Sequence, residues 1–181
     1  SRSRRIDVNE QVKEILARRA NAPETLTDEE RDILRQYTGA GGLASGTVEA
    51  LNQHYTDYET IRAIYHALDA AGFKYRKALE PAVGSGNFVG NQPRLDWTTV
   101  DIDETNHQIV KLLYPDAKHY NISFEDLKEG GFDLVISNVP FLENRGVRRN
   151  KPLPHIKTLH DFYFVHALDK VKDNGLVVFI T

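Results

Sequence analysis

The sequence predicts an α/β fold, with a mostly parallel sheet flanked by helices and an N-terminal helical segment before it. From residue 76 onward, short apolar runs alternate with amphipathic segments, and this alternation is typical of parallel sheets covered by helices on both faces. Upstream of that point the apolar residues recur at helical spacing instead. At 181 residues, the chain is long enough for one domain with a sizeable core and an appended element.

The first expected helix covers residues 8–20, where apolar side chains recur at helical spacing. Thr27 followed by Glu30 resembles a capping box, in which each residue bonds the other's backbone. That pair predicts the start of a second helix, which Gly39 could close.

A loop and a third helix are expected next. The glycine-rich stretch of residues 37–46 favours a loop, whereas residues 57–70 carry a helical apolar face that ends at Gly72. These features divide the chain into an N-terminal helical extension with a glycine-rich loop, residues 1–50, and an α/β core, residues 51–181.

The core should contain five strands separated by helices. The expected strands cover residues 77–80, 98–102, 117–120, 132–138 and 175–181. The expected helices lie near residues 87–92, 104–113 and 158–172. In such sheets ligands bind outside the carboxyl ends of the strands, where the strand order reverses. Functional residues are therefore expected directly after strands.

Composition restricts the environment and the partners. No apolar stretch approaches the roughly 18 residues of a membrane span, the first residues have no apolar signal region, and cysteine is absent. These features favour a cytoplasmic protein without membrane contact. The net charge of -3 predicts that any binding of nucleic acid is local. The chain ends within an apolar run, which is an unusual place for a complete domain to stop.

The first candidate site follows the strand at residues 77–80. Gly84 and Gly86 would let the backbone approach a ligand closely, and Asn87 would begin a helix whose free N–H groups favour a carboxylate or phosphate. A tight turn without a ligand has the same pattern. With Gly90, the glycines also form a variant of the nicotinamide dinucleotide fingerprint.

The second candidate site is the acidic end of the next strand. Asp101 and Asp103 stand about where a ribose-binding acid is expected, and Asp101 is the preferred candidate. Asp103 also suits the simpler role of capping the following helix.

The third candidate site is the corner at residues 138–141. Asn138 offers an amide oxygen as acceptor, Pro140 stiffens the turn, and Phe141 offers a flat face for stacking. Two oxygen acceptors and a ring can bind a planar group that carries an amine, such as a nucleobase. A β-turn that merely ends a strand is the alternative.

In this order, the three motifs resemble the class I S-adenosylmethionine-dependent methyltransferases, and more narrowly the N6-adenine DNA methyltransferases. Asn138-Val139-Pro140-Phe141 is similar to their Asn/Asp-Pro-Pro-Tyr/Phe motif, with valine in place of the first proline, and residues 80–88 are similar to their cofactor loop. Residues 37–43 are similar to a segment of large phage and mobile-element proteins that join such a methylase domain to a helicase.

The resemblance implies a Rossmann-like methyltransferase core, S-adenosylmethionine as cofactor and a flipped adenine in DNA as substrate. By the same resemblance, the C-terminal strands of the core are expected to be absent from this chain. The implied cofactor-binding residues are Tyr55, Thr56, Glu80, Gly84, Gly86, Asp101 and Phe124. The implied catalytic residues, which would hold the target base, are Asn138, Pro140 and Phe141. Further domains of a longer polypeptide, such as a helicase or a target-recognition domain, are the implied partners.

A basic segment follows the corner. Its cations are Arg145, Arg148, Arg149 and Lys151. They could hold phosphates while a base is rotated out of the stack, or form a solvated loop. His155 and His160 have no neighbouring cluster of ligands in the sequence, so no metal site is predicted.

Two other functions fit the same residues. One is a catalytically silent methyltransferase-like module that binds DNA or a partner, as in an antirestriction protein. The other is methylation of a protein glutamine amide at N5, because those enzymes share an Asn-Pro-Pro-Tyr corner and a planar amide target. Binding of S-adenosylmethionine would exclude neither enzyme but would argue against a silent module.

Overall fold

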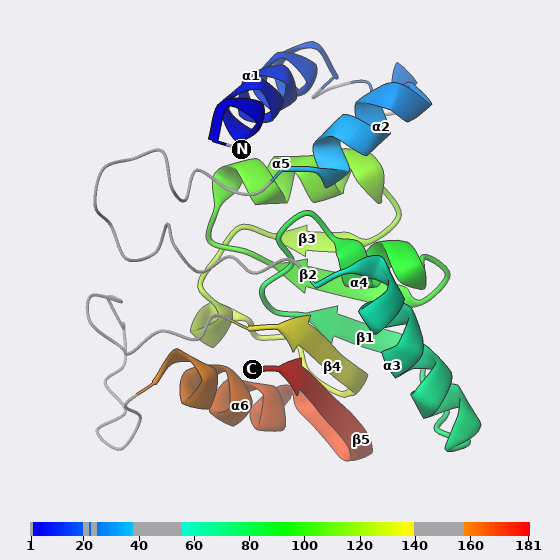
Figure 1. Cartoon of the computed structure of the whole chain (residues 1–181). Helices are drawn as coiled ribbons and strands as arrows, with labels where there is room; N and C mark the ends of the chain where they lie inside the picture. Colours follow the sequence, from blue (N-terminus) through cyan, green and yellow to red (C-terminus); the bar gives the residue numbers. More distant parts are fainter. Residues whose placement is uncertain (1, 20–21, 23–24, 38–55, 140–157) are drawn as a thin grey trace.

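The computed structural model describes residues 2–19, 22, 25–37, 56–139 and 158–181, with the side chains of residues 2–6 excepted. Its helices are α1 (Arg2–Arg19), α2 (Asp28–Arg35), α3 (Tyr58–Ala70), α4 (Asn87–Asn91), α5 (Glu104–Leu113), α6 (Leu159–Lys170) and the 3₁₀ turn η3 (Phe124–Asp126). Its strands are β1 (Lys77–Glu80), β2 (Asp96–Val100), β3 (Lys118–Tyr120), β4 (Phe132–Asn138) and β5 (Val171–Ile180). Figure 1 shows their arrangement.

The strands form one five-stranded sheet in the order β3-β2-β1-β4-β5. Every neighbouring pair is parallel, so all carboxyl ends meet at one edge of the sheet (Figure 1). The chain runs from β1 outward to β3 and then returns to β4 on the other side of β1. The strand order therefore reverses between β1 and β4, and the predicted α/β fold with its parallel sheet is confirmed.

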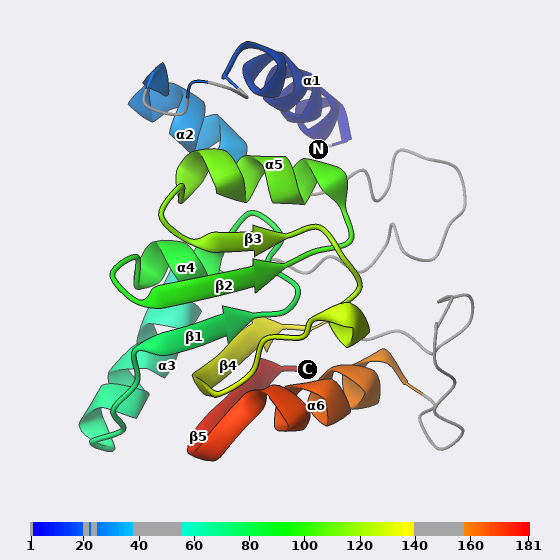
Figure 2. The same ribbon diagram turned by 180° about the vertical axis from the view of Figure 1, so that it is seen from behind.

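Helices cover both faces of the sheet. On one face, α3 and α4 pack against Ala78, Leu134 and Ile136 of the central strands. On the other face, α6 and η3 pack against Leu79 and Val135. In the view from behind, α6 lies in front of the sheet and α3 lies beyond it (Figure 2). Because β1 and β4 are buried from both sides, their central side chains are apolar: Ala78 and Leu79 in β1, and Leu134, Val135 and Ile136 in β4.

The N-terminal helices rest on α5 rather than on the sheet (Figure 1). Their apolar faces form a cluster with that helix, whose members include Val12, Ile15, Leu16, Leu34, Ile109, Leu112 and Leu113. The predicted capping box is present, since Thr27 accepts from the Glu30 N–H and Glu30 accepts from the Thr27 N–H. Arg19 also donates to both carboxylate oxygens of Glu30 at 3.2 Å, which joins α1 to α2.

Some element boundaries differ from those expected. Helix α2 ends at Arg35, before Gly39, which lies outside the described residues. Strand β2 covers residues 96–100 rather than 98–102, because the Asp101 carboxylate accepts from the Asp103 N–H and turns the chain. Strand β5 begins at Val171 rather than residue 175, with a register irregularity in its pairing to β4.

At the opposite edge of the sheet, Asp133 joins β4 to β1. Its carboxylate accepts from the Arg76 and Lys77 N–H groups at 2.8 Å each and pairs with Lys172. The Lys172 hydrogen bond, together with these two N–H donors, lowers the pKa of Asp133 to about 2. Since the pKa is lowered by folding, this stabilisation is present above the unfolded value of about 3.9 and is lost as pH falls towards 2.

We expect Asp133→Asn to lower the free energy of unfolding at pH 7 by about 1.5–3 kcal/mol, because hydrogen bonds to a charged acceptor are lost. The difference from wild type should shrink as pH falls from about 5 to 2. Chemical denaturation at several pH values measures both effects. Asp169→Asn is the matched control, because Asp169 is exposed and, in the part of the chain that the structure describes, forms an ion pair only with the adjacent Lys170. A difference that does not change with pH would contradict the role of the charge.

Among the described residues, no helix is long and apolar enough to cross a membrane.

Candidate functional site

The candidate site lies at the carboxyl ends of β1, β2 and β4, next to the point where the strand order reverses. The loop between β1 and α4 is held from both sides. The Val83 N–H donates to the Val100 carbonyl at 3.1 Å, and the Ser137 hydroxyl donates to the Ala82 carbonyl at 3.3 Å. The loop that carries the predicted glycines is thereby fixed against both neighbouring strands.

The glycines of this loop and of α4 are required for two reasons, a left-handed backbone and close packing. Gly84 and Gly86 have φ values of 54° and 82°, a left-handed conformation that other residues rarely adopt. A Cβ on Gly86 would lie 2.6 Å from Cε2 of Tyr114, and one on Gly90 would lie 2.5 Å from the Tyr114 hydroxyl. The space left by these two glycines is therefore filled by Tyr114. A role for Gly84 and Gly86 in binding a ligand stays a prediction.

Glu80 ends β1 as a buried acid, with only 2% of its surface exposed. Its Oε2 has no hydrogen-bond partner among the described residues. Burial, followed by the nearby charge of Asp101, raises the pKa of Glu80 well above its ordinary value, and a hydrogen bond from the Val89 backbone opposes this only in part.

Two hydroxyls of the segments that flank α4 on its N-terminal side are also without partners in the described part of the chain. They are Oγ1 of Thr56, just before α3, and Oγ of Ser85, between the two glycines. Asn87 donates its side-chain N–H to the Thr56 carbonyl at 3.5 Å, which places Thr56 beside the start of α4. Buried polar atoms are nearly always paired in proteins, so these orphan oxygens favour a polar ligand. Ser85 was not predicted as a site residue, although its position between glycines at a strand end was a usable signal.

Asp101 organises the loop as much as it offers a binding group. Its Oδ2 accepts from the Gly84 N–H at 2.9 Å and from the Asn106 amide at 3.1 Å, and its Oδ1 accepts from the Asp103 N–H at 2.9 Å. Burial outweighs these bonds and raises the pKa of Asp101 to about 6. Asp103 caps α5 by accepting from the Thr105 and Asn106 N–H groups, as its sequence position predicted.

Phe124, predicted to border the cofactor, lies in η3 with 2% of its surface exposed. It stacks on Tyr163 of α6, with ring centroids 5.7 Å apart. Burial, together with the charge of Asp101, raises the pKa of Tyr163, so this ring lies near the Asp101 carboxylate. Ile102, between the two acids, is 76% exposed. Tyr163 was not predicted, because its approach to Phe124 and Asp101 depends on how α6 packs in the folded chain. Ile102 was not predicted either.

Asn138 is the last residue of β4 and is half-buried. Strands β4 and β1 are direct neighbours, with Leu79 opposite Val135, and the Ser137 hydroxyl bonds the β1–α4 loop. The structure thus brings Asn138 to the same sheet edge as Glu80 and Gly84.

Several predicted site residues lie outside the described residues. They are Tyr55, Pro140, Phe141, Arg145, Arg148, Arg149 and Lys151. Among the residues that are described, no three His, Asp or Glu side chains come together as metal ligands.

The fold is that of the class I S-adenosylmethionine-dependent methyltransferases. A putative enzyme of this class from Listeria monocytogenes superposes with a TM-score of 0.58 at 18% identity, over 87% of this chain and 55% of that one. A type I restriction-modification methyltransferase subunit from Streptococcus thermophilus gives a TM-score of 0.53 at 17% identity, over 83% of this chain and 38% of that one. The resemblance to this class is confirmed for the fold.

A relative by sequence is the "Defense against restriction protein B" of Escherichia phage P1. It is 30% identical over 162 residues, which are 86% of this chain and 7% of the phage protein. The chain thus spans only a small part of the length of that relative. No protein-family model matches the sequence.

Proposed function

We propose that this chain forms part of a methyltransferase that transfers a methyl group from S-adenosylmethionine to the N6 amine of adenine in DNA. The observation that carries the proposal is the position of Asn138 at the end of β4, beside the glycine loop at the end of β1. In open α/β sheets, this reversal of strand order is where ligands bind.

The residues present fit the proposed cofactor. The orphan oxygens of Thr56, Glu80 and Ser85 supply a carboxylate and two hydroxyls, which suit the ammonium and carboxylate groups of an amino acid. Asp101, with one oxygen engaged by a single donor, has room for a ribose hydroxyl. When bound, S-adenosylmethionine supplies an electrophilic methyl group on a sulfonium.

The chain's own residues would hold and activate the adenine. An exocyclic amine is a weak nucleophile, because its lone pair is delocalised into the ring. The Asn138 amide oxygen and a backbone carbonyl of the corner would accept its two hydrogens, which favours the pyramidal amine that can attack. Phe141 would stack on the base. No side chain has to be ionised for this step.

The DNA contact is proposed for the basic segment after the corner. Its members, Arg145, Arg148, Arg149 and Lys151, would bind phosphates while the adenine is flipped out of the duplex. Since the chain covers 7% of its phage relative, a longer polypeptide with helicase or target-recognition parts is the proposed setting, in the cytoplasm.

The direct test is a methyl-transfer assay with methyl-labelled S-adenosylmethionine and unmethylated DNA, on the 181-residue chain and on the full polypeptide. We expect labelled N6-methyladenine after digestion of the DNA. Label on glutamine of an added protein would instead support protein N5 methylation. Calorimetry with S-adenosylmethionine and with NAD shows which cofactor the site takes.

A second candidate is an antirestriction module without catalysis, which the name of the phage relative favours. The two functions differ in whether S-adenosylmethionine binds and whether methyl groups reach DNA. Absence of both, with protection of DNA from restriction retained, would favour the silent module.

We expect Asp101→Ala to weaken S-adenosylmethionine binding by about 1–3 kcal/mol through the loss of a ribose hydrogen bond and of the Gly84 anchor. Calorimetric titration measures the change. Asp103→Ala is the matched control, because Asp103 is occupied by the α5 N–H groups and should affect stability more than affinity. The reverse order of effects would make Asp103 the ribose-binding acid.

A further inference from the structure

Glu80 and Asp101 form a pair of acids at the carboxyl ends of β1 and β2. Glu80 is 2% exposed, and its Oε2 lacks a partner among the described residues. The two strands are hydrogen-bonded neighbours, with Glu80 opposite Thr99. Each carboxylate therefore acts on the other through a buried region, where two like charges close together are energetically unfavourable.

No cation of the described residues compensates this pair. Neither acid has an ion pair with a Lys, Arg or His in that part of the chain. Within the described residues, Asp101 accepts hydrogen bonds from three donors, whereas Glu80 accepts only from the Val89 backbone. Glu80 is therefore the member of the pair on which a proton is retained.

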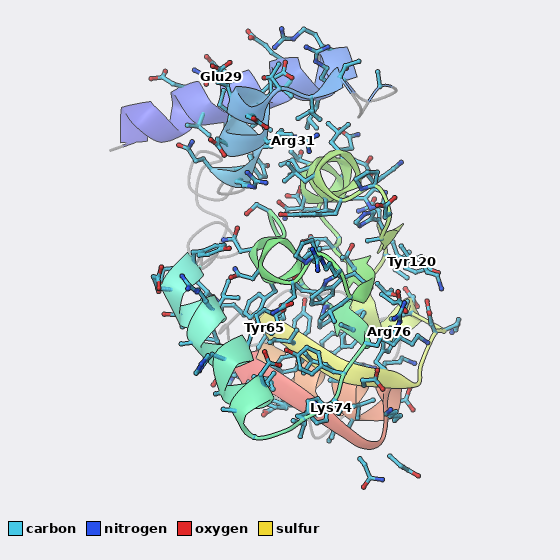
Figure 3. The ribbon with its side chains drawn as sticks, turned by 90° about the vertical axis from the view of Figure 1, so that its right-hand side faces the viewer. Glu29, Arg31, Tyr65, Lys74, Arg76 and Tyr120 are labelled. Atoms are coloured by element: carbon cyan, nitrogen blue, oxygen red, sulfur yellow. The ribbon has the colours of Figure 1, made fainter. Side chains whose placement is uncertain are left out.

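The other groups facing Glu80 do not change this assignment. Tyr65 of α3, drawn beside α4 and the sheet in Figure 3, donates its hydroxyl to the Phe88 carbonyl at 2.9 Å. Tyr114, from the end of α5, interacts with Arg35 and with Glu80. Burial is the largest cause that raises the pKa of both phenols, so they stay neutral.

We infer that the ligand-free protein carries a proton on the Glu80–Asp101 pair and releases it when a cationic ligand group arrives, so that Glu80 selects for the charge of the ligand. The proton passes to the buffer, and the cation takes its place as the partner of the carboxylate. The inference rests on the proposed function, in which the cationic group is the ammonium or the sulfonium of S-adenosylmethionine.

The first measurement needs no variant. S-adenosylmethionine is titrated into the wild-type chain at about pH 6.5 in phosphate and in imidazole, whose ionisation enthalpies differ, and the difference in heat gives the number of protons released. We expect close to one proton, and a dissociation constant that falls by up to about tenfold per pH unit as the pH rises, as long as the ligand-free pair still carries the proton. Equal heats and a flat pH profile would overturn the inference.

Related ligands identify the cation. S-adenosylhomocysteine lacks the sulfonium but keeps the ammonium, and methylthioadenosine lacks both charges. Release with S-adenosylhomocysteine assigns the ammonium, and release with S-adenosylmethionine alone assigns the sulfonium. Equal release with methylthioadenosine would contradict selection by charge.

Variants locate the proton. Glu80→Gln, similar in shape to the protonated acid, should abolish the release and flatten the pH profile. Glu129→Gln is the matched control: Glu129 pairs with Lys77 and Lys118 and its replacement should leave the release unchanged. Full release from Glu80→Gln would remove Glu80 from the mechanism.

The two levels of inference fail differently. Binding of S-adenosylmethionine without proton release overturns the proton exchange and leaves the proposed function standing. No binding of S-adenosylmethionine by wild type overturns both.

Discussion

Asn138→Ala should lower the rate of methyl transfer to adenine by about 10²–10³-fold, which is typical of removing one preorganised group that stabilises a transition state. The amide oxygen is the proposed acceptor for a hydrogen of the adenine amine, and alanine offers none. Cofactor affinity should stay within a few-fold, because the orphan oxygens proposed for the cofactor belong to other segments. Single-turnover rates and calorimetric titration measure the two quantities separately.

Two substitutions make this result specific. Asn138→Asp keeps an oxygen acceptor and should retain part of the activity. Asn91→Ala removes an asparagine whose amide bonds only the Asn87 carbonyl, within α4, and should leave the rate close to wild type. A wild-type rate for Asn138→Ala would remove this side chain from the mechanism, whatever the affinity for the cofactor.

Gly86→Ala should lower the free energy of unfolding by about 2–5 kcal/mol, the sum of two costs. A left-handed φ of 82° costs an alanine about 1–2 kcal/mol. Its Cβ would also lie 2.6 Å from Tyr114 and 3.2 Å from Val110, and overpacking costs about 1–3 kcal/mol. Denaturant unfolding measures the total.

Gly72→Ala separates the two costs, because Gly72 has a φ of 75° but no atom within 4 Å of the new Cβ. It should cost only the backbone part, about 1–2 kcal/mol. Tyr114→Leu removes the ring from the space beside Gly86. The double variant with Gly86→Ala should therefore lose less stability than the sum of the losses in the two single variants. Equal costs at Gly72 and Gly86 would show that Tyr114 moves aside freely.

Local patterns in the sequence were sufficient to predict most elements. The Thr27–Glu30 capping box, the cap at Asp103 and the end of α3 near Gly72 each depend on residues a few positions apart. The short runs with apolar side chains predicted all five strands, most clearly β1 and β4, whose central residues are buried from both faces. Predicted boundaries were wrong where a single residue changes the backbone direction. In β5, for example, Asn174 has a φ of 63°.

The candidate site was predictable only in part. Residues directly after strands could be selected because the topology of a parallel sheet brings its carboxyl ends together. Tertiary contacts could not be predicted in this way. Tyr114 fills the space beside Gly86, and Asn106 holds Asp101. The Ser85 hydroxyl has no partner among the residues that the structure describes. Each of these features depends on how separate segments pack.

The position of α5 has a practical consequence for anyone trimming this protein. Its first turn holds Asn106 against Asp101, while its outer side carries Ile109 and Leu113, which α1 and α2 cover. A shortened version beginning near residue 51 would expose these apolar side chains to solvent, one or two helical turns from the residue that holds Asp101. Loss of ligand affinity after such a deletion would then reflect a loosened scaffold, even though every residue of the site had been kept.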